Sequence, residues 1–453
     1  MSNHIASEIS NNNSLETKKL GIKELTSLSA GQVIGAGVVT LVGQAIGLTG
    51  RSVWLAYMTA ILMGFCIIFP YLMLSSMIRV KGGNYSFVAA VLGDTWGGVY
   101  GMVFTLNMLA SGMFGISMGT YINSIIPSVP ITPTAIVTVT LFFVLNLSDV
   151  GIIAKAQNYM TITLLTGLAL FIIIGIFKLQ PGTFNFSSPD YFTGGKSGFL
   201  AAVMMLVYSC TGHSFVVSFS KDAKNPRRDV PFAIIFATII ILVVYCSIAL
   251  VDSNILPIKE VTARPLTDVA KTIMSKPLAY AFVIGGPIAA LATTLNSSYG
   301  VFSRPVAQMC ADGWFSKSLT KKNKNGVPYK VMFVMYVISI LPILLGLNIK
   351  EIVSNVVLVA RIADIVGVVA VMFVPKKLPE AWENRYFKIP KSLFYLLMTI
   401  SLIVSLTCVI LSLRTITQTQ VIATVILLIV FFVYSTIRQR SGKVKMEKSY
   451  ELN

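Results

Sequence analysis

Charged residues and histidines are scarce in this 453-residue chain, and their scarcity excludes several classes of protein. Only 12% of the residues are charged, against about 25% in a soluble globular domain. Two histidines, His4 and His213, supply too few ligands for a histidine-built metal or catalytic centre. The five cysteines show neither disulfide-framework nor zinc-site spacing. No P-loop motif and no catalytic triad signature is visible. We therefore expect no enzyme, no cofactor, no metal centre and no ATP-driven pump.

Long apolar runs are what the sequence does contain, since 55% of its residues are hydrophobic. Most of these runs are close to the roughly 20 residues that a helix needs to cross a bilayer. They predict an all-α integral membrane protein with twelve transmembrane helices. The expected spans are 27–47, 53–78, 98–126, 131–148, 158–177, 198–220, 231–251, 281–309, 329–347, 351–374, 392–413 and 420–437.

The net charge of +18 does not predict a nucleic-acid partner. Most of the 36 basic residues fall in the tails and in alternate loops, all on one side of the predicted membrane. The positive-inside rule then places both termini in the cytoplasm. Residues 1–26 form a cytoplasmic N-terminal tail, and 438–453 form a basic cytoplasmic tail. The plasma membrane is the expected location.

Two of the apolar spans contain glycines where a spanning helix should be continuous. The first reads Val33–Gly43 and holds three glycines, and the second is centred on Tyr208–Ser214. A glycine inside a helix costs about 1 kcal/mol relative to alanine. Exposed backbone at mid-membrane is tolerated only where it lines a cavity or is buried in protein. Two such interruptions at corresponding places indicate the substrate site of a secondary transporter.

These interruptions divide the chain into two structural halves. Residues 27–177 form a first five-helix repeat, and 198–374 form a second. Because five is an odd number of crossings, the second half enters the membrane in the opposite sense, as an inverted repeat. Residues 391–437 supply helices 11 and 12. Helices 1 and 6 are the broken ones.

Several short motifs, in this order and spacing, resemble the amino acid–polyamine–organocation superfamily of permeases over nearly the whole chain. They are Gly35-Ala36-Gly37, Lys81-Gly82-Gly83-Asn84-Tyr85, the segment from Asp222 through Asn225-Pro226 to Pro231, the segment from Leu295-Asn296 to Asp312-Gly313, and Tyr386–Pro390. Together with the twelve predicted spans they make the chain similar to amino acid permeases of this superfamily.

The resemblance implies where a substrate binds. Its carboxylate would meet the free N–H groups at the first interruption, and its amino group the free carbonyls at the second. Helix dipoles support the same assignment, because helix N-termini attract anions and C-termini attract cations. The implied substrate-binding residues are Ile34, Ala36, Gly37, Tyr208, Ser209, Thr211 and Gly212. Tyr208 stands where some relatives have an aromatic gate, although an ordinary packing role is the alternative.

Two further sets of polar residues are candidates for this site. Asn107 and Ser111 are four residues apart and would share a helical face, either lining the pocket or bonding another helix. Thr293 and Thr294, with backbone oxygen at Gly35, form a candidate sodium site, because Na⁺ prefers oxygen ligands. The alternative for both threonines is plain helix–helix contact.

Three other sites within the membrane do not determine which ion, if any, is coupled to transport. The resemblance puts Leu164 where several relatives carry a coupling lysine, so coupling through that position is in doubt. Arg361 and Asp364 are three residues apart and within reach of each other, as a functional or a structural ion pair. His213 could titrate or be structural.

We therefore predict a secondary amino acid transporter that works by alternating access, as symporter or exchanger with Na⁺ or H⁺. No acidic residue is next to either interruption, which favours a neutral or small amino acid. The alternatives are an antiporter for a cationic amino acid or polyamine and, in another class, a transporter-like nutrient sensor or a channel. A monomer and a homodimer both fit.

Overall fold

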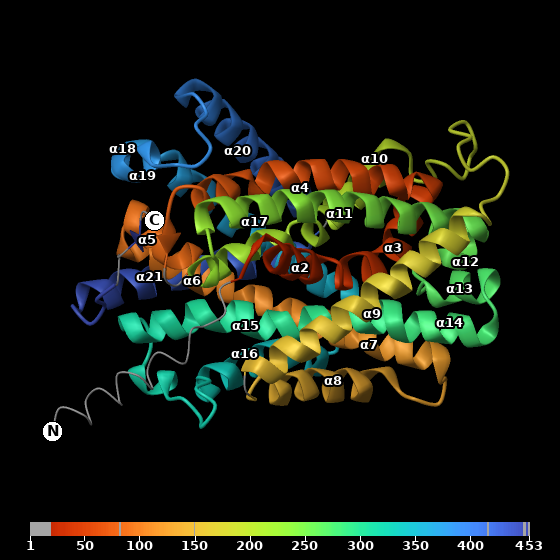
Figure 1. Cartoon of the computed structure of the whole chain (residues 1–453), viewed down its shortest axis with the longest axis horizontal. Helices are drawn as coiled ribbons and strands as arrows, with labels where there is room; N and C mark the ends of the chain where they lie inside the picture. The colour runs from red at the N-terminus through yellow and green to blue at the C-terminus, as the bar shows by residue number, and fades with distance from the viewer. Residues whose placement is uncertain (1–19, 81–82, 149, 415, 447–449, 452–453) are drawn as a thin grey trace, which may run out of the picture.

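The computed structural model is a bundle of helices and describes residues 20–80, 83–148, 150–414, 416–446 and 450–451 (Figure 1). The long helices run side by side between two ends. One, here called the α5 end, carries α5 (Asn84–Leu92), α18 (Val374–Lys377) and α19 (Pro379–Glu383). The other, the α13 end, carries α12 (Ile258–Val261), α13 (Thr267–Ile273) and α14 (Lys276–Val283).

A helix, or a pair of helices, covers each predicted span. Among the described residues, eight segments are long and apolar enough to cross a membrane, and three shorter apolar helices accompany them. The uninterrupted helices are α4 (Val53–Ser75), α8 (Ile131–Leu145), α9 (Val150–Ile176), α11 (Pro226–Ile255), α16 (Tyr329–Leu344), α17 (Ile349–Met372), α20 (Lys391–Leu413) and α21 (Gln418–Arg440). The chain is therefore a multi-pass membrane protein.

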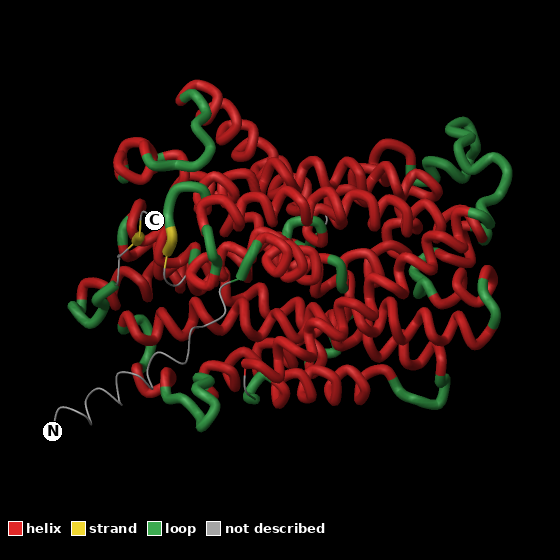
Figure 2. The backbone as a smooth tube through the Cα atoms, viewed as in Figure 1, coloured by secondary structure: helices red, strands yellow, loops and turns green. Residues whose placement is uncertain are grey.

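The two glycine-rich spans are interrupted in the structure. Two residues separate helix α2 (Ile22–Val33) from α3 (Ala36–Thr49). Helix α10 (Gly195–Ser209) is followed after two residues by the 3-10 helix η3 (Gly212–Asp222). Both interruptions lie within the bundle rather than at its ends (Figure 2).

Two other predicted spans depart from a continuous α-helix. Residues 98–126 were expected as one helix, but α6 (Asp94–Thr105) and α7 (Ala110–Ile125) are joined by the 3-10 turn η2 (Leu106–Leu109). In the span 281–309, the π-turn η4 (Ile284–Ile288) precedes α15 (Ala289–Asp312) and contains Pro287. Proline lacks an N–H donor, so the regular hydrogen-bond ladder cannot continue through it.

The described elements are helical, as an all-α fold predicts, apart from one two-residue strand pairing. Strand β1 (Arg79–Val80) pairs antiparallel with β2 (Tyr450–Glu451), which joins the C-terminal segment to the α4–α5 connection. The Lys445 N–H also donates to the Asp312 carbonyl at 2.8 Å, at the end of α15. The two strands are far apart in the sequence, and two residues are too few to show the alternation of polar and apolar side chains that marks a strand. The sequence therefore did not predict this pairing.

Apolar side chains cover the outer surface of several helices. In the most apolar stretch of α21 only 6% of the residues are buried inside the protein, and in those of α9 and α20 the share is 28%. Such faces would be unfavourable in water, since burying apolar surface is worth about 25 cal/mol per Å². They therefore face the lipid tails. On their other sides, α20 packs on α4 and α17, α21 packs on α6, and α9 packs on α11 and α15.

Candidate functional site

The two interruptions lie against each other in the middle of the bundle. A Cβ atom built on Gly37 would be 2.8 Å from Ser209 Cβ and 3.1 Å from the Ser209 carbonyl oxygen. One built on Gly212 would be 3.3 Å from Val33 Cγ2. Ser29 Oγ also donates to the His213 carbonyl at 2.9 Å. Glycine at position 37 thus allows the closest approach of the two broken helices.

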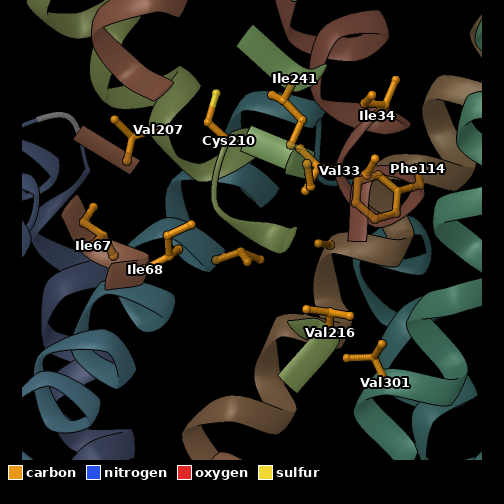
Figure 3. Close-up of a cluster of buried hydrophobic side chains, with 14 of the residues drawn as sticks. Val33, Ile34, Ile67, Ile68, Phe114, Val207, Cys210, Val216, Ile241 and Val301 are labelled. Carbon is orange, nitrogen blue, oxygen red and sulfur yellow. The ribbon is translucent and has the colours of Figure 1, made fainter. Parts of the chain in front are cut away.

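Apolar residues from both interruptions form the surrounding core (Figure 3). Val33 and Ile34 from the first, and Val207 and Cys210 from the second, belong to one buried cluster with Ile241 of α11. Because this core holds both broken helices, the free backbone groups keep a fixed position. A pre-formed arrangement of this kind is what a small-molecule site requires.

Two tyrosine hydroxyls donate hydrogen bonds to backbone carbonyls at the first interruption. The Tyr245 hydroxyl, from α11, donates to the Val33 carbonyl, and the Tyr57 hydroxyl, from α4, donates to the Gly37 carbonyl at 3.4 Å. Their rings meet edge to face at 5.3 Å. No side chain caps the start of α3. The Val38 N–H is bonded to the Tyr245 hydroxyl oxygen. The Ala36 and Gly37 N–H groups, at the very start of α3, are therefore the ones that would meet an anion, while nearby carbonyls are already bonded.

Hydroxyl groups at the second interruption bond their own helix end. Ser209 Oγ donates to the Leu206 carbonyl at 2.8 Å, and Thr211 Oγ1 donates to the Tyr208 carbonyl at 3.1 Å. The C-terminus of α10 also carries the negative end of its helix dipole, which favours a cation. Because each of these carbonyl oxygens has a second lone pair, the site still presents N–H donors on one side and carbonyl acceptors on the other.

A cavity begins between the interruptions and extends toward the α5 end, where Asn84 and Tyr100 line it. Seven of the sequence-predicted residues line it: Gly37, Asn107, Tyr208, Ser209, Thr211, Gly212 and Thr294. Ile34, Gly35, Ser111 and Thr293 lie behind this wall and are buried. Ala36 begins α3, but its side chain is outside the described part of the structure.

The 3-10 turn in span 3 separates Asn107 from Ser111. Asn107 lines the cavity and donates to the Phe104 carbonyl at 2.9 Å, whereas Ser111 Oγ donates to Met108 Sδ at 3.6 Å. A 3-10 helix turns about 120° per residue instead of about 100°, so the three steps from Asn107 to Ala110 add about 60° of rotation. The two side chains therefore leave the common face that an α-helix would give them.

The candidate sodium residues pack against the first interruption. Thr293 Oγ1 and Thr294 Oγ1 both donate to the Ala290 carbonyl, at 2.8 and 3.1 Å. A Cβ atom on Gly35 would be 1.7 Å from Thr294 Oγ1. Because each hydroxyl donates its hydrogen, its lone pairs remain for another partner. This geometry suits either a cation or close packing.

Aromatic and charged wall residues were not assigned to the cavity from sequence. Phe104, Phe215 and Phe302 come from α6, η3 and α15, and their ring centres are 5.4–5.5 Å apart. Arg361 and Asp364 also line the cavity, where Arg361 Nη2 is 3.1 Å from Asp364 Oδ2. Their three-residue spacing predicted this contact, but not its position in the cavity wall.

His213 and Leu164 lie outside the cavity wall. His213 is buried, and its Nε2 atom is 2.9 Å from Thr238 Oγ1. Leu164 is fully buried in the apolar core. Within the described part of the chain, no group of three or more histidine, cysteine, aspartate or glutamate side chains could hold a metal ion.

Direct contacts cover the site toward the α13 end. Tyr121 Oη of α7 donates to the Val39 carbonyl at 2.6 Å, and Thr40 Oγ1 donates to Ser117 Oγ at 3.1 Å. The Ala263 N–H bonds the Gly43 carbonyl at 2.8 Å. These bonds tie α3 to α7 and to the segment after α12. The cavity and these contacts therefore lie on opposite sides of the interruptions.

Substitutions of Tyr208 test whether its side chain helps to close the cavity over a bound substrate. Its ring lines the cavity at the end of α10. We expect Tyr208→Ala to reduce substrate uptake about tenfold or more, because the ring's cover is lost, and Tyr208→Phe to retain most of it. Uptake by purified protein in liposomes measures both. Equal uptake by wild type and both variants would show that Tyr208 only packs.

Comparisons with known proteins show similarity to amino acid permeases. A family model described as amino acid permease matches residues 20–432. The branched-chain amino acid permease BcaP of Bacillus subtilis is 24% identical, over 82% of this chain and 84% of its own length. The aromatic amino acid permease FywP of Lactococcus lactis is 25% identical, over 72% and 76%. A D-serine/D-alanine/glycine transporter of Escherichia coli K12 is 21% identical, over 69% of both.

Proposed function

The chain belongs to the amino acid permease family, and from this premise we propose that it is a secondary transporter of a neutral or small amino acid that works by alternating access. The observation that carries the proposal is the meeting of two interrupted helices at one cavity. The uncapped start of α3 would take the substrate carboxylate. The end of α10 would take the amino group.

The charge of the cavity wall supports a substrate without net charge. Arg361 and Asp364 are paired with each other, so neither is left to balance a charged substrate side chain. The three relatives described above are named for branched-chain, aromatic and small amino acids. The alternative, exchange of a cationic amino acid or polyamine, would need an acidic group free of Arg361. A nutrient sensor or channel is the alternative from another class.

We further propose twelve crossings in a five-plus-five inverted repeat, with both termini in the cytoplasm. The basic loops support this orientation. The α5 end is then cytoplasmic, and the structure represents an inward-facing state with its outer side closed by Tyr121 and the Ala263 segment. Both a monomer and a homodimer are compatible with this function.

Counterflow in proteoliposomes tests the proposed function. Liposomes loaded with one unlabelled amino acid at a time should accumulate the same labelled amino acid from outside, with a neutral or small amino acid giving the largest signal. Protein-free liposomes are the control. Accumulation of arginine or a polyamine alone would favour the alternative exchanger, and a flux without saturation would favour a channel.

A substitution at Thr294 tests whether uptake is coupled to Na⁺. We propose that Thr293, Thr294 and backbone oxygen at Gly35 bind Na⁺, with H⁺ coupling and uncoupled exchange as the alternatives. Thr294→Val keeps the shape that packs on Gly35 and removes one oxygen ligand. The Na⁺ concentration for half-maximal uptake should rise about tenfold or more, while substrate selectivity stays unchanged. Wild-type uptake that is the same in Na⁺, K⁺ and choline would contradict the sodium site.

A further inference from the structure

Arg361 and Asp364 form an ion pair in the cavity wall, and a hydrogen bond links Arg361 to the second interruption. Arg361 is 2% exposed, and its Nη2 atom donates to Thr211 Oγ1 at 3.1 Å. The same atom is 3.1 Å from Asp364 Oδ2. The Tyr71 hydroxyl donates to Asp364 Oδ1 at 3.3 Å and holds the carboxylate from the opposite side. The pair is thus fixed in place by α4 and the second interruption.

This pair retains unused hydrogen-bonding capacity. Arg361 Nε and Nη1 are buried and have no partner among the described residues. Asp364 Oδ2 has the ionic contact with Arg361 but no further hydrogen bond within that part of the chain. An unsatisfied buried polar group costs about 1–3 kcal/mol, and a charged one costs more. A buried ion pair contributes little net stability, so stability alone does not explain this pair. Because both residues line the cavity, their unbonded groups point to a ligand.

We propose that Arg361 and Asp364 recognise the side-chain amide of the substrate, so that this transporter prefers an amino acid of the asparagine or glutamine class. The inference rests on the proposed function. A primary amide has one carbonyl oxygen and two N–H donors. Its oxygen would accept from the guanidinium, and its N–H group would donate to Asp364. Both kinds of free group would then be satisfied by one neutral side chain.

Charge and polarity separate an amide from the competing side chains. A side-chain carboxylate would add a second negative charge beside Asp364, and an ammonium would add a positive one beside Arg361. An apolar side chain would leave the Arg361 donors unpaired. A site built to hydrogen-bond its substrate rejects analogues that lack the bonding group, because its own polar atoms then stay unsatisfied. A primary amide offers an acceptor for the Arg361 donors and two N–H donors for Asp364 without adding charge.

The position of the pair fits a substrate held by its backbone groups at the interruptions. Thr211, which accepts the Arg361 bond, follows directly on the end of α10 that would receive the amino group. A side chain that extends from that point toward the α5 end meets Arg361 and Asp364 on α17. Arg361 and Asp364 are thereby positioned to select the end of the side chain rather than its backbone.

Competition in proteoliposomes tests the inference. For wild-type protein, glutamine or asparagine should be transported with a kcat/KM at least about tenfold above those of methionine and glutamate. The double variant Arg361→Leu/Asp364→Leu replaces the pair by apolar groups, a change that is often tolerated in protein interiors. The ratio of its kcat/KM for glutamine to that for methionine should fall about tenfold or more. Equal losses for glutamine and methionine would make the pair structural.

A single variant gives an independent reading that does not depend on how the double variant folds. Asp364→Asn keeps the shape and removes the charge that balances Arg361. Its preference should shift from glutamine toward glutamate, which a purely structural pair would not cause. An unchanged ratio of glutamine to glutamate would overturn the inference. Wild-type transport of apolar amino acids alone would overturn it and leave the proposed function intact, whereas no transport of any amino acid would overturn both.

Discussion

Gly37→Val is expected to abolish amino acid uptake while the protein still inserts into the membrane. A Cβ atom at position 37 would be 2.5 Å from the Tyr245 hydroxyl and 2.8 Å from Ser209 Cβ. The valine side chain therefore separates the two interruptions and fills the space before the first N–H groups of α3. The apolar spans that direct insertion are unchanged. Uptake should fall about a hundredfold or to background, as measured in proteoliposomes with equal amounts of inserted protein.

Gly300→Ala is the matched control for this variant. Gly300 also lies in a helix of the bundle, but a Cβ atom there meets nothing within 4 Å. Its uptake should remain within about twofold of wild type. Uptake like that of wild type by correctly inserted Gly37→Val would contradict the placement of the substrate site.

Gly35→Ala should be strongly destabilising. The added Cβ would be 1.7 Å from Thr294 Oγ1 and 2.6 Å from the Ala290 carbonyl oxygen. Overpacking of this kind typically costs about 1–3 kcal/mol, and here a backbone atom blocks relaxation. We expect a lower midpoint of thermal unfolding in detergent and lost uptake. Gly300→Ala again serves as the control.

A second substitution separates the two contacts at Gly35. Thr294→Ala removes the hydroxyl but leaves the Ala290 carbonyl in place. Gly35→Ala/Thr294→Ala should therefore recover only part of the lost thermal stability. Full recovery would show that the side chain alone limits the approach. An unfolding midpoint of Gly35→Ala equal to that of wild type would contradict the packing of α2 and α3 on α15.

Local features of the chain determined the helices and the interruptions. Each apolar run is contiguous in sequence, so its length and composition predict a helix without knowledge of its neighbours. The glycines around Gly35 and Gly37 mark the first interruption for the same reason, because their helix propensity is a local property. The contact between Arg361 and Asp364 also followed from spacing on one helix.

Tertiary packing alone decided which of these groups meet in the cavity. The contact of Gly37 with Ser209 joins residues far apart in the sequence, and the 3-10 turn that rotates Ser111 away from Asn107 breaks the α-helical period on which the expectation relied. The same holds for the aromatic wall around Phe104 and for the Arg361 contact with Thr211. Local sequence specifies the period and polarity of a helix, but the rotation and neighbours of each helix come from the packing of the whole bundle.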